Sequence, residues 1–152
     1  MKLIAHRANT NGPNSNTENN PDKIIECIEN GYNVEVDIRY DIKTDALWLG
    51  HDTPEYMVNW WWLAGKADHL WIHCKDIQTL HEFSTKTSSY NYFWHQNDDY
   101  TLTSKNYIWS YPGKSYTSNT VIVMPETVNI DLKMLLVYNC YGVCTDFVDK
   151  LV

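Results

Sequence analysis

The chain lacks any long run of apolar residues. Its apolar stretches are a few residues each, whereas a membrane-spanning helix needs about 20 predominantly apolar residues in a row. The first residues, Met-Lys-Leu-Ile-Ala, do not open an apolar run of signal-peptide length either. We therefore expect no transmembrane segment, and a cytoplasmic location.

Basic residues are also scarce. The 152 residues include 12 Lys plus Arg against 19 Asp plus Glu, a formal net charge of −7. Such a balance repels a phosphate backbone unless the basic residues cluster, so nucleic acid is not an expected partner. Carboxylates in a cleft attract hard cations, and the composition therefore favours a divalent metal over a polyanion.

Paired cysteines are missing as well. Cys27, Cys74, Cys140 and Cys144 form no C-x-x-C motif, and free cysteines usually behave as small core residues. We expect four buried free thiols. No internal repeat is visible, and the length suits one domain spanning residues 1–152.

What the sequence does contain is a hydrophobic share of 43%, with seven Trp and eleven Tyr, which predicts a folded domain. Apolar and aromatic runs alternate with amphipathic segments of helical period, a pattern typical of a mostly parallel α/β sheet. The expected strands are residues 3–5, 34–38, 47–49, 69–74, 90–95, 107–109, 121–124 and 141–144, and the expected helices are residues 21–30, 76–84 and 130–138.

Two carboxylates, Glu35 and Asp37, alternate with Val34, Val36 and Ile38 in one of these strands. Because side chains two residues apart leave the same face of a strand, both carboxylates could share one cation. The pattern alone leaves open whether that face points into a barrel or outward, where it would simply be solvated.

Other residues suited to phosphate, metal and proton transfer surround these carboxylates in the chain. His6-Arg7 ends the preceding strand, Glu18-Asn19 lies in an Asn-rich loop, and His51-Asp52 ends the following strand. The ordered blocks I-A-H-R, E-N, V-E-V-D-I-R and L-G-H-D resemble the signature of the glycerophosphodiester phosphodiesterase family, a (β/α)-barrel group related in fold to phosphatidylinositol phospholipases C.

The resemblance implies a compact (β/α) TIM-type barrel with several helices shortened or missing, because a full barrel needs about 200 residues or more. We accordingly expect loops or single turns at residues 100–107 and 109–120. The resemblance also implies roles for the matching residues. His6 and His51 would be the general acid and base, Arg7 would bind phosphate, Glu18 and Asn19 would shape the substrate site, and Glu35 and Asp37 would bind Mg²⁺ or Ca²⁺.

Two later segments extend the resemblance. Trp71-Ile72-His73-Cys74-Lys75 resembles an I-E-x-K strand, with His73 in place of the third metal ligand and Lys75 as a phosphate ligand. The alternatives are a core histidine and a surface lysine. Gly142-Val143-Cys144-Thr145-Asp146 resembles the last family strand, which suggests that the barrel closes.

The chain also departs from the family pattern. Ala8 replaces the glycine that follows His-Arg, and the short link at residues 52–68 predicts an open, shallow site. Within that link, the aromatic residues 60–62 are expected either to pack in the core or to form a substrate-facing rim. His95, Gln96, Tyr111 and Glu126 are further candidates for the mouth of the site.

The function expected from these features is metal-dependent hydrolysis of a glycerophosphodiester or similar small phosphodiester. Two alternatives stay open. One is a phosphate- and metal-binding module without turnover. The other is a lyase in which a substrate hydroxyl attacks phosphorus and leaves a cyclic phosphate.

Overall fold

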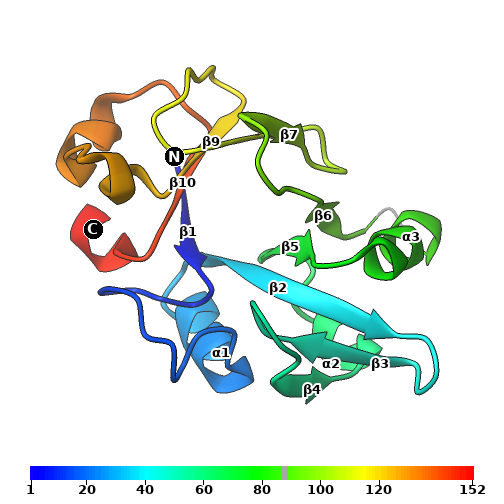
Figure 1. Cartoon of the computed structure of the whole chain (residues 1–152). Coiled ribbons are helices and arrows are strands. Elements are labelled where there is room, and N and C mark those ends of the chain that lie inside the picture. Colours follow the sequence, from blue (N-terminus) through cyan, green and yellow to red (C-terminus); the bar gives the residue numbers. More distant parts are fainter. Residues whose placement is uncertain (87–88) are drawn as a thin grey trace.

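One mixed sheet curls around itself and stays open along one side (Figure 1). The computed structural model describes residues 1–86 and 89–152. The strands are β1 (Lys2–His6), β2 (Asn33–Asp41), β3 (Ala46–Leu49), β4 (Tyr56–Val58), β5 (Leu70–Cys74), β6 (Asn91–Phe93), β7 (Tyr100–Leu102), β8 (Ile108–Ser110), β9 (Thr120–Val123) and β10 (Gly142–Thr145). The α-helices are α1 (Pro21–Glu29), α2 (Trp60–Ala64) and α3 (Ile77–Lys86), and the 3-10 helices are η1 (Pro125–Val128), η2 (Leu132–Val137) and η3 (Val148–Leu151).

The parallel part of the sheet runs in the order β6-β5-β2-β1-β10-β9-β8. β3 and β4 extend β2 as an antiparallel meander, and β7 pairs with β8 in an antiparallel hairpin. The chain thus returns from β2 to β3 through a hairpin. In the register of the sheet, His6 lies opposite Glu35, and Asp37 lies opposite His73.

The expectation of a (β/α) barrel is wrong. β10 does pair with β1, but within residues 1–86 and 89–152 no ladder joins β6 to β8, so the sheet is an open half-barrel. The turn after β7 bridges the opening, where the Ser104 amide donates to the Tyr92 carbonyl at 2.9 Å. The physical reason is length: the segments between β6 and β9 are too short to form helices that would cover and space further strands.

The helix predicted at residues 21–30 is confirmed as α1, and residues at its two ends explain where it starts and stops. Asn20 caps α1 by accepting hydrogen bonds from the amides of Asp22 and Lys23, Pro21 occupies the first turn, and Gly31 lies just beyond the end with φ +87°. Ile24 and Cys27 are the buried residues of α1. Residues 76–84 are also helical as predicted, within α3.

Several local predictions fail. Residues 130–138 contain the 3-10 helix η2 instead of an α-helix, with only Leu132 and Leu135 buried, at the three-residue spacing that a 3-10 helix presents. Residues 100–107, expected to form a loop or a single turn, contain β7. The 52–68 link, for which no helix or strand was predicted, contains β4 and α2. All three are short elements without a strong period.

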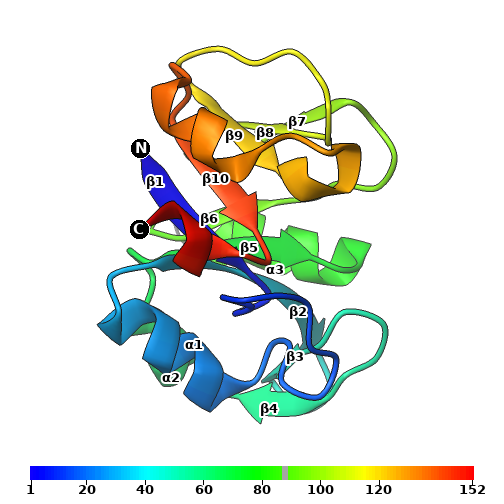
Figure 2. The same cartoon turned by 90° about the vertical axis from the view of Figure 1, so that its left-hand side faces the viewer.

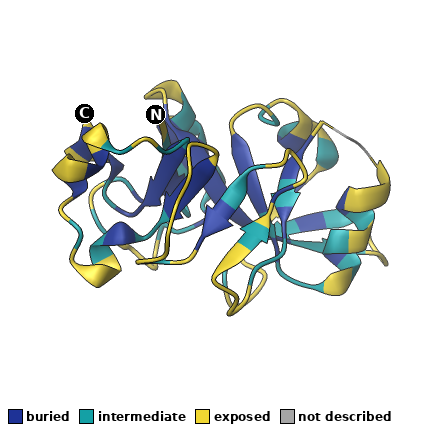
Figure 3. Ribbon diagram, turned by 90° about the horizontal axis from the view of Figure 1, so that it is seen from above, coloured by how far each residue is buried: buried dark blue, intermediate teal, exposed yellow. Residues whose placement is uncertain are grey.

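The two faces of the sheet bury different residues. The outer face packs an aliphatic core, including Val34, Val36 and Ile38, under α1 and α3. The inner face is filled by Trp71, Phe93 and Trp109, with Ile4, Val121 and Cys144. Figures 2 and 3 show the helices outside the sheet and the exposed residues mostly in peripheral loops and turns.

Three of the four cysteines, Cys27, Cys74 and Cys144, are buried free thiols as expected, and Cys140 is half-buried. None of the helices among the described residues is long and apolar enough to cross a membrane.

Candidate functional site

A pocket of about 540 Å³ opens at the carboxyl ends of the parallel strands. This edge is where side chains from several strand ends converge in parallel sheets. Nine residues singled out from the sequence contribute to its wall. The lining is His6, Arg7, Glu35, His51, His73, Lys75, His95, Gln96, Trp109, Tyr111, Pro112, Val123, Met124 and Thr127.

Glu35 and Asp37 point to the inner side of the curled sheet, away from solvent. They are 2% and 0% exposed, while the alternating residues of β2 pack in the outer core. The strand pattern left open whether this face points inward or outward, and the curl of the sheet places it on the inner side. Two buried carboxylates on the same face of one strand require positively charged or hydrogen-bonding partners.

Those partners surround Asp37. The Lys75 ammonium lies 3.1 Å from Oδ1, the Arg7 Nε lies 3.3 Å from Oδ2, and the side-chain Nδ2 of Asn19 donates to Oδ2 at 3.0 Å. Although burial alone would raise it, the bond from His73 and the charges of Lys75 and Arg7 hold the pKa of Asp37 well below its usual range. Asp37 is therefore ionised, and the surface-lysine alternative for Lys75 does not describe its position.

His73 presents one edge of its ring to both carboxylates. Nδ1 lies 3.2 Å from Asp37 Oδ1 and 3.7 Å from Glu35 Oε1, while Nε2 lies 2.9 Å from the His95 carbonyl and donates to it. Burial opposes the charged ring, but hydrogen bonds to Asp37 and Glu35 raise the pKa of His73 to about 9. A cation bound at this place would replace the Nδ1 proton.

His6 is oriented by Asp146, a residue for which the sequence predicted no role. Asp146, directly after β10, lies 2.8 Å from His6 Nδ1, and Asn9 donates to the same carboxylate oxygen at 2.8 Å. Burial disfavours the charged imidazole, yet the bond to Asp146 and the charge of Glu35 raise the pKa of His6. His6 Nε2 is 4.0 Å from Glu35 Oε2, so this nitrogen faces the site.

The signal for Asp146 was present in the sequence as an acidic residue that follows a strand. A parallel strand that ends in an acidic residue beside a histidine-bearing strand predicts such a pair, provided that the two strands are neighbours. Their adjacency, β1 beside β10, is a property of the tertiary fold.

Arg7 and Ala8 adopt left-handed backbone conformations, with φ of 52° and 65°. Left-handed backbone is uncommon for residues other than glycine and often marks functional loops. The turn aims the Arg7 guanidinium at Glu18 Oε2, 3.2 Å away, and lets the Arg7 amide donate to Glu35 Oε2 at 3.2 Å. Asn9 donates to the other oxygen of Glu18 at 3.1 Å. Glu18 therefore holds both Arg7 and Asn9, in the loop that follows β1.

His51 also lines the pocket, and 36% of its side chain is exposed, against 15% for His6. Arg39 holds the loop in place by donating to the carbonyls of Gly50, His51 and Asp52. His51 Nδ1 lies 2.7 Å from Asp52 Oδ1. In the described part of the chain no hydrogen bond or ion pair links His51 to His6, so the two imidazoles share the pocket without touching.

Of the remaining candidates, some line the pocket and others do not. His95, Gln96 and Tyr111 line the pocket. Glu126 does not line it, but accepts a hydrogen bond from the Asp146 amide at 3.0 Å. Residues 60–62 lie elsewhere and form no rim: the Trp60 ring packs against Phe83 and Tyr90 with centroids 5.4 and 6.3 Å apart, and Trp61 is 88% exposed on α2.

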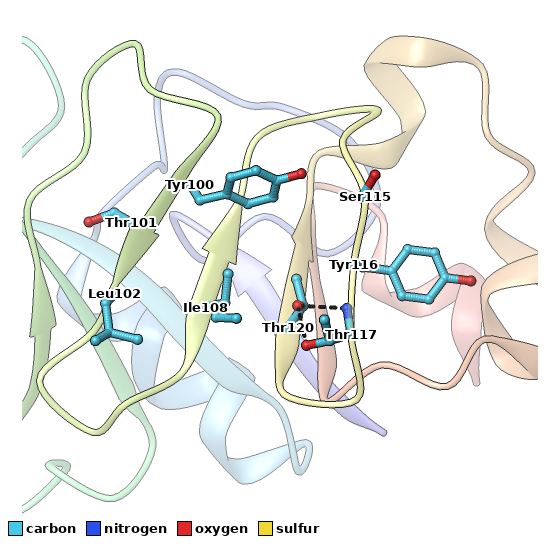
Figure 4. Close-up of a pocket in the computed structure, with 8 residues that line it drawn as sticks. All are labelled: Tyr100, Thr101, Leu102, Ile108, Ser115, Tyr116, Thr117 and Thr120. Carbon is cyan, nitrogen blue, oxygen red and sulfur yellow. Dashed lines mark hydrogen bonds between the residues drawn. The ribbon is translucent and has the colours of Figure 1, made fainter.

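A second hollow, of about 370 Å³, lies on the β7–β8 side of the sheet (Figure 4). Its wall is mostly apolar and offers no carboxylate, imidazole, ammonium or guanidinium group. It can bind an apolar group but cannot support acid–base or phosphate chemistry.

The donor set at the carboxyl ends of β2 and β5, beside the 540 Å³ pocket, fits a divalent cation. Ligand atoms of Glu35, Asp37 and His73 all lie within 4.8 Å of one another. Asp37 Oδ1 is buried, and its contacts with the Lys75 ammonium at 3.1 Å and with His73 Nδ1 at 3.2 Å are ion pairs that lack the geometry of a regular hydrogen bond. Two carboxylates and one imidazole are ligand types that divalent metals share in proteins.

Comparison with models of protein families, with curated proteins and with solved structures finds no match to this chain.

Proposed function

We propose that this protein hydrolyses a small phosphodiester, such as a glycerophosphodiester, to a phosphomonoester and an alcohol. The observation that carries the proposal is the convergence of His6, His51, Arg7 and Lys75 on the same pocket as a buried two-carboxylate cluster. The resemblance of the ordered sequence blocks to glycerophosphodiester phosphodiesterases supports the same reaction class.

The proton transfers fall to the two histidines. Attack of water on phosphorus requires a base for the water proton, and departure of the alkoxide requires an acid. His6, which Asp146 and Glu35 favour in its protonated form, is suited to donate a proton to the leaving oxygen. His51, the more exposed of the two imidazoles, is suited to accept a proton from water.

Phosphate binding falls to Arg7 and Lys75. Both carry fixed positive charge on the wall of the pocket, and their contacts with Asp37 and Glu18 hold them in place before a substrate arrives. Preorganised donors stabilise charge that develops on phosphoryl oxygens without further rearrangement.

A divalent ion held by Glu35, Asp37 and His73 would supply neutralising charge to the phosphoryl oxygens when bound. The pocket volume of about 540 Å³ lies in the range of sites for small molecules, which agrees with a headgroup-sized substrate.

The test is turnover of a panel of phosphodiesters, followed by phosphorus NMR in the presence of divalent cations. We expect a linear phosphomonoester as product, and a loss of about 100-fold or more in kcat for His6→Asn and His51→Asn. His81→Asn, at an exposed position of α3, should leave kcat unchanged.

Undiminished turnover in His6→Asn, with circular dichroism showing a folded protein, would refute the acid–base assignment. A cyclic product would support the lyase route instead. Metal and phosphate binding without turnover on any diester tested would favour a binding module.

A further inference from the structure

The candidate metal ligands of this chain include the imidazole of His73, whose orientation is fixed by a hydrogen bond on the side of the ring away from the carboxylates. The Nε2 hydrogen of His73 is used by the His95 carbonyl at 2.9 Å, so only Nδ1 can offer a lone pair to a cation. Such a carbonyl partner sets the tautomer of ligating histidines and raises their basicity.

The plane of the ring is fixed as well. Phe93 stacks on the His73 ring with centroids 5.1 Å apart and an interplanar angle of 9°. The parallel register of β2 and β5 places His73 directly opposite Asp37. The nitrogen lone pair is thus preorganised toward the two carboxylates and does not swing in from solvent.

The charges around the carboxylates also disfavour a hard cation. Asp37 already lies 3.1 Å from the Lys75 ammonium and 3.3 Å from the Arg7 guanidinium. Mg²⁺ and Ca²⁺ bind mainly through the charge of oxygen ligands, and Mg²⁺ gives up its water shell reluctantly. Metals that bond well to imidazole nitrogen depend less on that charge.

Resting on the proposed function, we propose that this site selects a divalent transition metal, of the Mn²⁺, Co²⁺ or Zn²⁺ type, over Mg²⁺ and Ca²⁺, and that His73 is the residue that determines the choice. The two carboxylates provide the anionic oxygens common to both metal classes. His73 supplies the nitrogen that distinguishes them.

The experiment measures metal affinity by calorimetry on chelator-stripped protein, with Mg²⁺, Ca²⁺, Mn²⁺, Co²⁺ and Zn²⁺ titrated separately. Because nearly every nitrogen- or oxygen-bearing site binds Co²⁺ more tightly than Mg²⁺, the informative quantity is the ratio of the two affinities. His73→Glu makes all three candidate ligands carboxylates. His73→Gln replaces the imidazole nitrogen with an uncharged amide oxygen on a side chain of similar length.

We expect the Co²⁺ to Mg²⁺ affinity ratio to fall by about tenfold or more in both variants. His81→Glu makes the same exchange at an exposed position of α3 and should leave the ratio unchanged. The visible absorption bands of the Co²⁺ complex should change with His73→Glu and not with the control.

An unchanged ratio in the folded His73 variants, tighter binding of Mg²⁺ or Ca²⁺ than of Co²⁺ by the parent protein, or no metal binding at all would each overturn the inference. If neither variant folds, proton NMR of the parent Co²⁺ complex decides, since a coordinated imidazole shows ring protons shifted far outside the normal range. Absence of such signals would reject His73 as a ligand.

Failure of the metal-selectivity inference and failure of the proposed hydrolase function give different results. Metal-dependent turnover without nitrogen-based selectivity keeps the hydrolase and removes the inference. Selective binding of Co²⁺ or Zn²⁺ without turnover on any phosphodiester keeps the metal site and removes the hydrolase.

Discussion

At the scale of single residues, the most informative conformation is that of Ala8. It follows the strained Arg7, has φ 65°, and is only 6% exposed. Glycine would adopt this backbone without a steric cost. It would also remove a buried methyl group and raise the conformational entropy of the unfolded chain. At this position in the loop after β1, backbone strain destabilises the folded protein and burial of the Ala8 methyl group stabilises it.

We predict that Ala8→Gly changes the free energy of unfolding by less than about 1 kcal/mol, because relief of left-handed strain, about 1 to 2 kcal/mol, is offset by lost burial and greater unfolded-state entropy. Ala8→Val should cost about 2 kcal/mol or more, since a β-branched side chain is poorly accommodated at positive φ. Urea denaturation measures both. Equal stability of the two variants would contradict the strain argument.

At the scale of elements, α1 connects the site loop to the outer core. Its capping residue Asn20 directly follows Asn19, whose side chain bonds to Asp37, so the start of α1 and the carboxylate site are fixed together. One buried residue of α1, Cys27, contacts the same loop, with Sγ 3.5 Å from the Ala8 carbonyl.

Burial raises the pKa of the Cys27 thiol from 9.0 to about 11. The folded protein keeps this thiol neutral while the unfolded chain ionises it, so its contribution to stability is complete below pH 9 and is lost as the pH rises through 11. The loss is about 3 kcal/mol at most. We predict that Cys27→Ala shows a smaller drop in urea midpoint between pH 8.5 and pH 11 than the parent.

Cys140→Ala serves as the matched control for this pH dependence. Cys140 is half-buried, so its removal should leave most of the alkaline drop in place. A parent curve that is flat over this interval would show that Cys27 ionises as readily in the folded protein as in the unfolded chain.

At the scale of the whole molecule, aromatic side chains span the open side of the half-barrel, in addition to the turn after β7. The rings of Phe93 on β6 and Trp109 on β8 lie with centroids 4.6 Å apart, and Trp109 also lies 5.7 Å from Trp71. These rings fill the inner face beneath the carboxylates and carry the packing across the opening.

We predict that Trp109→Ala lowers the free energy of unfolding by about 3 to 5 kcal/mol, as expected for removing a buried aromatic residue. Trp61→Ala removes an indole that is 88% exposed and should change stability by about 0.5 kcal/mol or less. Chemical denaturation of the two variants provides the comparison. A mild effect of Trp109→Ala would mean that the opening does not depend on this aromatic contact.

Much of the local structure followed from the sequence. The cap and turn residues around α1 predicted that helix, and the alternation of Val34, Val36 and Ile38 with the two acids predicted a two-faced strand. The ordered blocks around His6, Glu35, Asp37 and His51 singled out residues that line or adjoin one pocket. These signals are short in range, because capping and side-chain alternation depend on residues within a few positions of one another.

The tertiary structure alone decided the curvature, the opening between β6 and β8, and the partner of His6. Each depends on contacts between segments far apart in the chain, such as β1 with β10, and no local period encodes them. The expected barrel was wrong for this reason: strand patterns specify which face is buried, whereas closure depends on how many strands and covering helices the whole chain can supply. The inward direction of Glu35 and Asp37 follows from that curvature.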